Sequence, residues 1–173
     1  MKRIKPEQFS EAYKLLERAF VPAELKTLER LLEEFLSNKL EIYGHFQNEI
    51  LCGVMTVWSL GNGFIFIENF AVSEDMRGQG IGTGMLNEIS DLLSPERILL
   101  EVETPDCENK LRRVKFYERN GFVLSEYGYT QPALRKNCEP VELRIMYKGK
   151  TINEKDFKDV NISIFRAVYS LNI

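Results

Sequence analysis

Residues 64–93, FIFIENFAVSEDMRGQGIGTGMLNEISDLL, decide the fold of this chain. They begin with an apolar run, aromatic and β-branched, that predicts a well-buried strand. A glycine-dense turn at 77–82 follows, and apolar residues then recur at helical spacing until Ser94-Pro95 ends the helix. Free backbone N–H groups and the positive end of the helix dipole meet at such a turn. The stretch therefore predicts an anion site, best suited to a phosphate or pyrophosphate.

Two common phosphate-binding motifs do not match this turn. The dinucleotide pattern Gly-x-Gly-x-x-Gly fails because its last glycine would fall on Thr83 or Met85. The P-loop pattern fails because Met85 follows Gly84 where a lysine is required. A nucleotide-binding domain is therefore disfavoured.

What remains is Arg77-x-x-Gly80-x-Gly82 after a strand, which resembles the acetyl-CoA signature of the GNAT superfamily of N-acetyltransferases. A second match, KFYERNGF at 115–122, resembles the family's helix that carries a tyrosine and ends at a glycine. The resemblance extends from the first helix to about Tyr147. It implies an α/β fold in which helices flank a central mixed sheet of about seven strands. The sheet would split where the central strand and the next one diverge.

The resemblance implies acetyl-CoA as co-substrate. The glycines would let the backbone approach the pyrophosphate closely, while Arg77 and Thr83 can add a charge and a hydroxyl, or be solvated. An ordinary glycine-rich turn without a ligand is the alternative. The residues expected to bind the cofactor are Phe70, Ala71, Val72, Arg77, Gly78, Gln79, Gly80, Ile81, Gly82 and Thr83.

The expected catalytic residues are one tyrosine and two carboxylates. By resemblance, Tyr117 would protonate the leaving thiolate, although it can equally be a half-buried tyrosine that packs on the sheet. Glu68 is a candidate base, since strand alternation would give it aromatic neighbours that raise its pKa. It can instead lie at the wet end of the strand, or a bulge can redirect it. Glu101, on the next strand, ranks nearly level with Glu68.

The acceptor side of the cleft is less defined. Glu103 shares a strand face with Glu101 and is expected to bind an ammonium-bearing substrate. Tyr127 and Tyr129 can form a stacking or cation–π wall for the acceptor, or simply an exposed strand edge. Arg113 stands where the family often has a small residue, and a solvated helix face is its expected place.

Composition excludes several classes of protein. The chain has 173 residues, a net charge of −3 and no long basic run, so nucleic acid is not an expected partner. Three widely spaced cysteines and one histidine argue against a disulfide framework and a metal site. No apolar run approaches the ~20 residues that span a bilayer, and no signal peptide is visible. We expect no membrane contact and a cytoplasmic location.

One domain is expected over residues 1–149, with the element order β-α-α-β-β-β-α-β-α-β-β. Residues 150–173 depart from the minimal family pattern and predict an amphipathic C-terminal helix that packs on the same domain, or else makes a dimer contact. The oligomeric state, monomer or homodimer, is left open.

The predicted function is transfer of an acetyl group from acetyl-CoA to an amine by direct attack, because no cysteine or serine has a nucleophile's setting. The acceptor is a small amine or a peptide or protein amine. The alternative is a non-catalytic module on the same fold that binds acyl-CoA or a partner.

Overall fold

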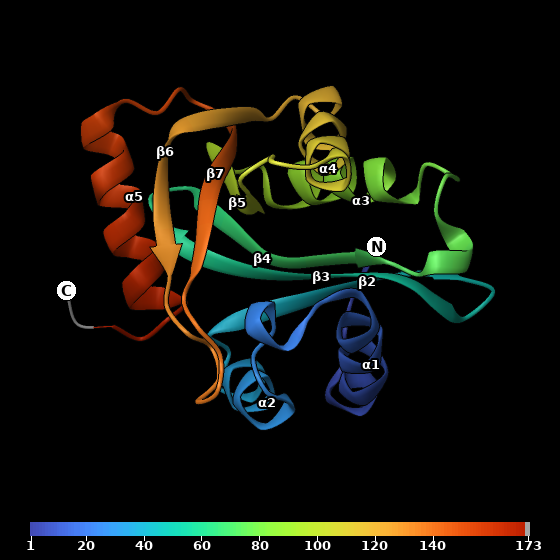
Figure 1. Cartoon of the computed structure of the whole chain (residues 1–173). Helices are drawn as coiled ribbons and strands as arrows, with labels where there is room; N and C mark the ends of the chain where they lie inside the picture. The colour runs from blue at the N-terminus through green and yellow to red at the C-terminus, as the bar shows by residue number, and fades with distance from the viewer. Residues whose placement is uncertain (172–173) are drawn as a thin grey trace.

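The computed structural model describes residues 1–171, which form one seven-stranded sheet in the order β1-β2-β3-β4-β5-β7-β6 (Figure 1). The strands are β1 (Lys2–Arg3), β2 (Leu40–Gln47), β3 (Ile50–Gly61), β4 (Phe64–Val72), β5 (Arg97–Glu103), β6 (Val123–Gln131) and β7 (Val141–Gly149). The α-helices are α1 (Phe9–Ala19), α2 (Leu28–Leu36), α3 (Ile81–Leu93), α4 (Glu108–Arg119) and α5 (Glu154–Ala167). Short 3₁₀ turns are η1 (Pro6–Gln8), η2 (Pro22–Glu24) and η3 (Glu74–Met76). The predicted mixed α/β sheet with flanking helices is confirmed.

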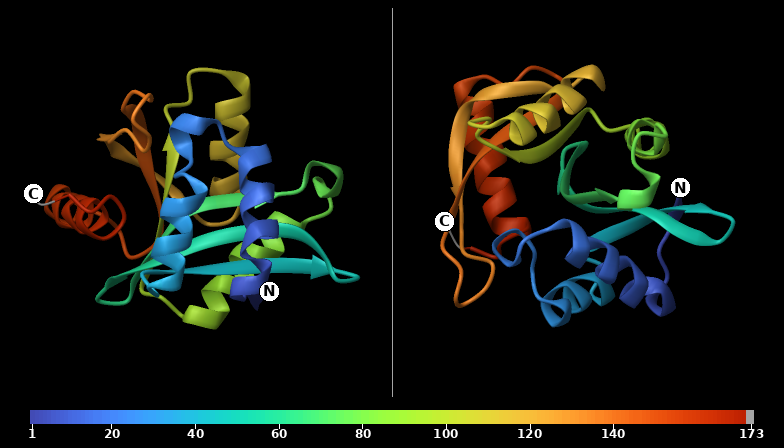
Figure 2. Two further views of the ribbon diagram at one scale, coloured as in Figure 1. Left: turned by 90° about the horizontal axis from the view of Figure 1, so that it is seen from below. Right: turned by 45° about the vertical axis from the view of Figure 1, so that its right-hand side comes forward.

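The sheet separates two apolar cores. Helices α1 and α2 cover one face of β2, β3 and β4 (Figures 1 and 2). On the opposite face, α3 packs on β4, and α4 packs on β5 and β6. Helix α5 joins the core of α1 and α2 through its buried residues Phe157, Val160 and Ile164. Arg97, at the start of β5, anchors the segment before α5 by donating to the carbonyls of Lys150 (2.9 Å) and Thr151 (2.8 Å).

The first helical hairpin differs from the expected one at its second helix. The apolar periodicity predicts a helix from Leu25, whereas α2 begins at Leu28 with Thr27 as its N-cap, whose side chain accepts from the Arg30 N–H. Leu25 and Lys26 lie in an extended link, pinned by Arg135, which donates to the Leu25 carbonyl, and by Tyr13, which donates to that of Lys26. This link turns the Lys26 side chain inward, where it is fully buried.

The central strand carries a bulge at Glu68. In the β3–β4 ladder Ile67 pairs with Val57 and Asn69 with Thr56, so Glu68 has no opposite residue. A bulge shifts the alternation of side chains by one position. Strand alternation would place Phe64, Phe66, Phe70 and Val72 on one face with Glu68. This holds for Phe64 and Phe66, which face the core of α1 and α2, and is wrong for Phe70 and Val72, which face that of α3 and α4.

The sheet splits immediately after this region. Strands β4 and β5 pair in parallel only from Phe64–Arg97 to Ile67–Leu100, after which β5 follows β7 alone. Within residues 1–171, the edge of β4 that faces β5 has no further strand partner from Glu68 onward. The predicted divergence of the central strand from the next one is thus present. No helix in the described part of the chain has the length and apolarity to cross a membrane.

Candidate active site

A cavity of about 570 Å³ lies where β4 and β5 separate. Its walls come from the end of β4, the glycine turn, the first turn of α3, and α4. Of the residues predicted to bind the cofactor, nine line this cavity: Phe70, Ala71, Val72, Arg77, Gly78, Gly80, Ile81, Gly82 and Thr83. The tenth, Gln79, is exposed, and its amide contacts the Met76 sulfur instead. The candidate catalytic residues Glu68, Glu101 and Tyr117 line the same cavity.

The glycine turn has the conformation that the anion-site prediction requires. Gly78 and Gly80 both adopt φ of +78°, in the left-handed region that other residues rarely occupy. Gly80 is the N-cap of α3, and its carbonyl accepts the first intrahelical hydrogen bond from the Gly84 N–H at 2.9 Å. The three residues between Gly80 and Gly84 therefore have N–H groups that make no intrahelical hydrogen bond. They remain available for a ligand at the positive end of the helix.

Gly82 sits where a side chain would fill the cavity wall. A Cβ placed there would lie 3.1 Å from Cζ of Phe116 and 3.6 Å from Cζ of Phe70. Both rings line the cavity, so residue 82 has to be small for them to stay in place. Beside this wall, the unpaired edge of β4 offers main-chain donors and acceptors to an extended ligand, as an open sheet edge does for an added strand.

Glu68 is buried and held in place by two partners. Its side chain is 4% exposed, and Oε2 accepts a 2.6 Å hydrogen bond from the Trp58 indole N–H. Oε1 lies 3.1 Å from Lys26 Nζ as an ion pair, in a geometry that makes no hydrogen bond. Glu68 therefore lies on the α1 and α2 side of the sheet, as Phe64 and Phe66 do, and the bulge reverses only the side chains that follow it.

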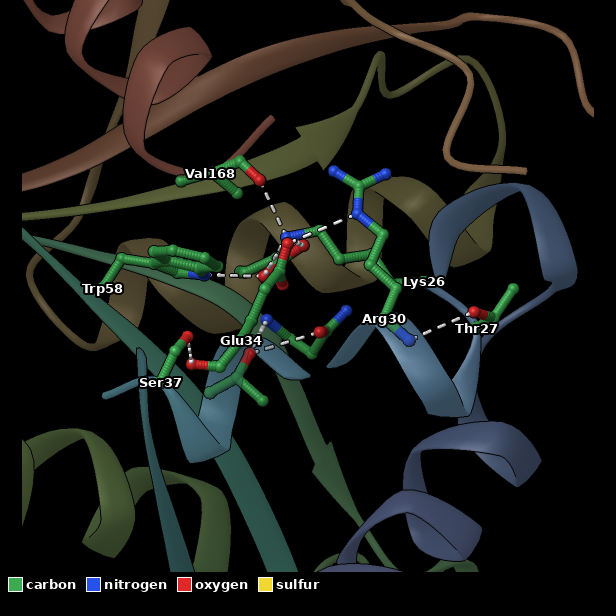
Figure 3. Close-up of polar contacts among 10 residues, drawn as sticks. Lys26, Thr27, Arg30, Glu34, Ser37, Trp58 and Val168 are labelled. Atoms are coloured by element: carbon green, nitrogen blue, oxygen red, sulfur yellow. Dashed lines mark hydrogen bonds and ion pairs between the residues drawn. The ribbon is translucent and has the colours of Figure 1, made fainter. Parts of the chain in front are cut away.

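Lys26 is the centre of this polar cluster (Figure 3). Its ammonium lies 2.8 Å from Glu34 Oε2, donates at 2.8 Å to the Val168 carbonyl, and stands 4.5 Å above the Trp58 ring. Arg30 reaches the other oxygen of Glu34 at 3.3 Å. A buried lysine between two carboxylates is fully compensated only while every partner is in place.

Glu101 has a different environment from Glu68. It accepts a 2.7 Å hydrogen bond from the Tyr169 hydroxyl. Burial raises the pKa of Glu101 to about 8; the Tyr169 hydrogen bond and Lys26 oppose this rise, while the Glu68 carboxylate adds to it. A carboxyl group with such a pKa is able to exchange a proton near neutral pH.

Tyr117 lies on α4 with its side chain packed against Phe116 and Phe122. It is 8% exposed and lines the cavity. Burial raises the pKa of Tyr117 to about 12, and nearby Arg113 lowers it in part. The hydroxyl therefore keeps its proton at neutral pH and can serve as a donor.

A smaller cavity of about 40 Å³ adjoins the main one and shares Glu68 and Glu101 with it. Glu103 lines this cavity and forms ion pairs with Lys110 at 3.4 Å and Arg113 at 3.3 Å. Arg113 is thus paired rather than only solvated. Glu24 is a further member, and burial together with Glu103 raises its pKa.

Tyr127 and Tyr129 lie elsewhere. Tyr127 packs against Phe157 with tilted rings whose centroids are 5.0 Å apart, and Tyr129 meets Phe165 edge-on at 5.6 Å. Both phenylalanines belong to α5, and neither tyrosine is among the residues that line the two cavities. Helix α5, which lies outside the minimal family pattern, covers the strand face on which these two tyrosines were expected to meet a substrate.

Sequence reasoning missed Lys26, Trp58 and Tyr169. A lysine in a charged helical hairpin and a tyrosine near the chain end carry no local signal of burial beside the cleft. Only the placement of Trp58 opposite the central strand could have been inferred, from the hairpin pairing of β3 with β4. Among residues 1–171, no cluster of three or more histidine, cysteine, aspartate or glutamate side chains could hold a metal ion.

Comparison with known proteins agrees with this geometry. The model of the acetyltransferase (GNAT) domain family matches residues 38–124. The structure superposes on a candidate GNAT-family acetyltransferase from Bacteroides thetaiotaomicron with a TM-score of 0.90 at 28% identity, covering 99% of this chain and 98% of the other. It also resembles a GNAT acetyltransferase from Elizabethkingia anophelis crystallised with acetyl-CoA bound (TM-score 0.57, 17% identity, 80% and 90% covered). That second likeness shows the fold alone.

In sequence, the chain is 30% identical over 113 residues to YjbC of Bacillus subtilis (strain 168), a candidate acetyltransferase. The match spans 63% of this chain and 57% of that relative. The family model covers half of the chain and includes the central strand, the glycine turn and the tyrosine helix. The chain belongs to the GNAT family of acetyltransferases.

Proposed function

We propose that this protein is an N-acetyltransferase that uses acetyl-CoA and transfers the acetyl group directly to an amine. One observation carries the proposal: a single cavity is bordered by a glycine-rich helix N-terminus, an unpaired strand edge, a carboxyl group with a pKa of about 8 and a protonated tyrosine. Anion binding, main-chain binding and proton transfer are the three capacities that acetyl transfer to an amine needs.

The residues present fit coenzyme A. The first-turn N–H groups of α3 and the Arg77 side chain would hold the pyrophosphate, and the free edge of β4 would bind the extended arm. Gly82 leaves the room that this arm requires between Phe70 and Phe116. When bound, acetyl-CoA supplies the acetyl thioester.

Glu101 is the proposed base. It faces both cavities, and its pKa of about 8 suits removal of a proton from an ammonium group. Glu68 is a weaker candidate because Trp58 and Lys26 both donate to its Oε2 and Lys26 holds its carboxylate in an ion pair. Tyr117 is the proposed acid. The amine nitrogen would form the new C–N bond as the C–S bond breaks; Glu101 would take the proton from the amine, and Tyr117 would give one to the thiolate.

The acceptor is expected to be an ammonium-bearing compound. It would enter by the smaller cavity, where Glu24, Glu101 and Glu103 lie. Partial neutralisation of Glu103 by Lys110 and Arg113 leaves Glu24 and Glu101 as the carboxyl groups that would meet the incoming charge.

A screen of amines with acetyl-CoA, read as release of free thiol, tests the proposal. The panel should hold small diamines, amino acids and peptides with free N-termini. Amine-dependent thiol release that is lost in Glu101→Gln, with acetyl-CoA affinity retained, would support it. Acetyl-CoA binding without turnover of any amine would favour a non-catalytic acyl-CoA-binding module instead.

A further inference from the structure

The chain turns back into the active site immediately after α5. Val168 is fully buried and Tyr169 is 5% exposed, although both lie within the last six residues of the sequence. The Tyr169 ring packs edge-on against Phe165 at 5.7 Å, and Tyr169 forms part of the wall of the smaller cavity. Tyr169 is thus part of the candidate acceptor site, and Val168 is buried next to it in the chain.

Tyr169 contacts one of the two carboxylates directly, and Val168 is linked to the other through Lys26. The Tyr169 hydroxyl donates directly to Glu101 Oε1 at 2.7 Å. The Val168 carbonyl accepts from Lys26 Nζ at 2.8 Å, and that ammonium pairs with Glu68 at 3.1 Å. The segment therefore constrains Glu101 by its side chain and Glu68 by its main chain.

We propose that Tyr169 is a positioning residue that orients Glu101 for proton transfer, while the Val168 carbonyl holds the Lys26–Glu68 pair beside it. The inference rests on the proposed function, since it assigns a positioning residue to the same base. If the proposal holds, Val168 and Tyr169 contribute to the active site as well as to the fold.

The expected effect follows from the groups around Glu101. Tyr169 faces it from the C-terminal segment, Glu68 from β4 and Lys26 from the link before α2, and Arg30 of α2 acts on Tyr169. A donor to a carboxylate stabilises its ionised form, so Tyr169 lowers the pKa that burial raises. Loss of the hydroxyl should therefore raise this pKa further and leave less ionised base at neutral pH.

Tyr169→Phe tests the proposal because it removes the hydroxyl and keeps the packed ring. We expect the acid limb of the kcat/KM profile to move to higher pH by about 1 unit. A hydrogen bond to a charged group changes the pKa of that group by roughly this amount. Activity at neutral pH should fall about tenfold and recover at high pH. Tyr147→Phe, in another buried tyrosine of the same core away from both cavities, is the matched control. Its profile should match wild type.

Two further measurements separate a positioning role from a structural one. In a Glu101→Gln background, Tyr169→Phe should cause no further loss, since its effect acts through Glu101. A ¹³C NMR titration of the Glu101 carboxyl carbon should show the same upward shift without any substrate. An unshifted Glu101 pKa, or a loss of activity equal at every pH, would overturn the inference. Wild-type protein that acetylates no amine would refute the proposed function separately, and the NMR titration would still decide the role of Tyr169.

Discussion

Replacing Lys26 by methionine tests whether the buried polar cluster holds the active site together. The substitution keeps an unbranched side chain of similar length and removes the charge. It leaves Glu34 and Glu68, whose side chains are at most 8% exposed, without their shared cation. It also removes the donor to the Val168 carbonyl and the cation above Trp58.

The magnitude follows from the burial of these groups. Removing one partner of a buried ion pair costs about 3–5 kcal/mol when the remaining charge has neither water nor a counter-ion. Glu68 would be left in that state, whereas Glu34 would keep Arg30. For a domain of this size each kcal/mol lowers the unfolding temperature by about 2–4 °C. A loss near the middle of that range, about 4 kcal/mol, corresponds to a decrease of roughly 8–16 °C.

Differential scanning calorimetry at neutral pH, with urea unfolding alongside, measures the effect. Lys158→Met is the matched control: it breaks an ion pair with Glu154 on α5 in which both side chains are more than two-thirds exposed. It should leave the unfolding temperature almost unchanged, because water replaces the lost partner. If Lys26→Met unfolded at the same temperature as Lys158→Met, the cluster would not have the structural role assigned to it.

Three other predictions concern the cavity. Gly82→Trp should weaken acetyl-CoA binding roughly 100-fold or more, because its side chain would occupy the space beside Phe116, whereas Gly84→Ala, where a Cβ meets no atom within 4 Å, should bind normally by calorimetry. Tyr117→Phe should lower kcat roughly 100-fold and spare acetyl-CoA affinity; full turnover would remove Tyr117 from the mechanism. Because Glu101 must be ionised to accept a proton and its pKa is about 8, kcat/KM should rise from about pH 7 to 9, and Glu101→Gln should abolish that limb.

The fold can be predicted from the sequence where neighbouring residues determine the local structure. The strand, turn and helix of residues 64–93 follow from apolar runs, glycines and a proline, and β4, Gly80 and α3 occupy those positions in the structure. The hairpin turns are equally local, since Asn48 and Glu49 adopt the positive φ that a tight turn between paired strands requires.

The positions of the side chains in the site are harder to predict, because they depend on contacts between residues that are distant in sequence. Because Glu68 has no partner in the β3–β4 ladder, every later side chain in β4 points to the face opposite to the one that alternation predicts. No residue type in the strand predicts this bulge. Lys26 is buried only because Glu34, Glu68 and Val168 converge on it from three elements. Tyr169 reaches Glu101 across 68 positions of sequence. Amphipathic patterning places α5 on the domain but does not show where its last residues point.

Calorimetric titration of acetyl-CoA into the purified protein, with NADH and ATP as controls, tests the central claim most directly. The claim is that the glycine turn and the free edge of β4 form a site for this co-substrate. It predicts saturable binding of acetyl-CoA at one site per chain, no binding of NADH, at most weak binding of ATP, and loss of the acetyl-CoA signal in Gly82→Trp. Wild-type protein that binds no acetyl-CoA, or a Gly82→Trp variant that binds it as tightly as wild type, would contradict the account.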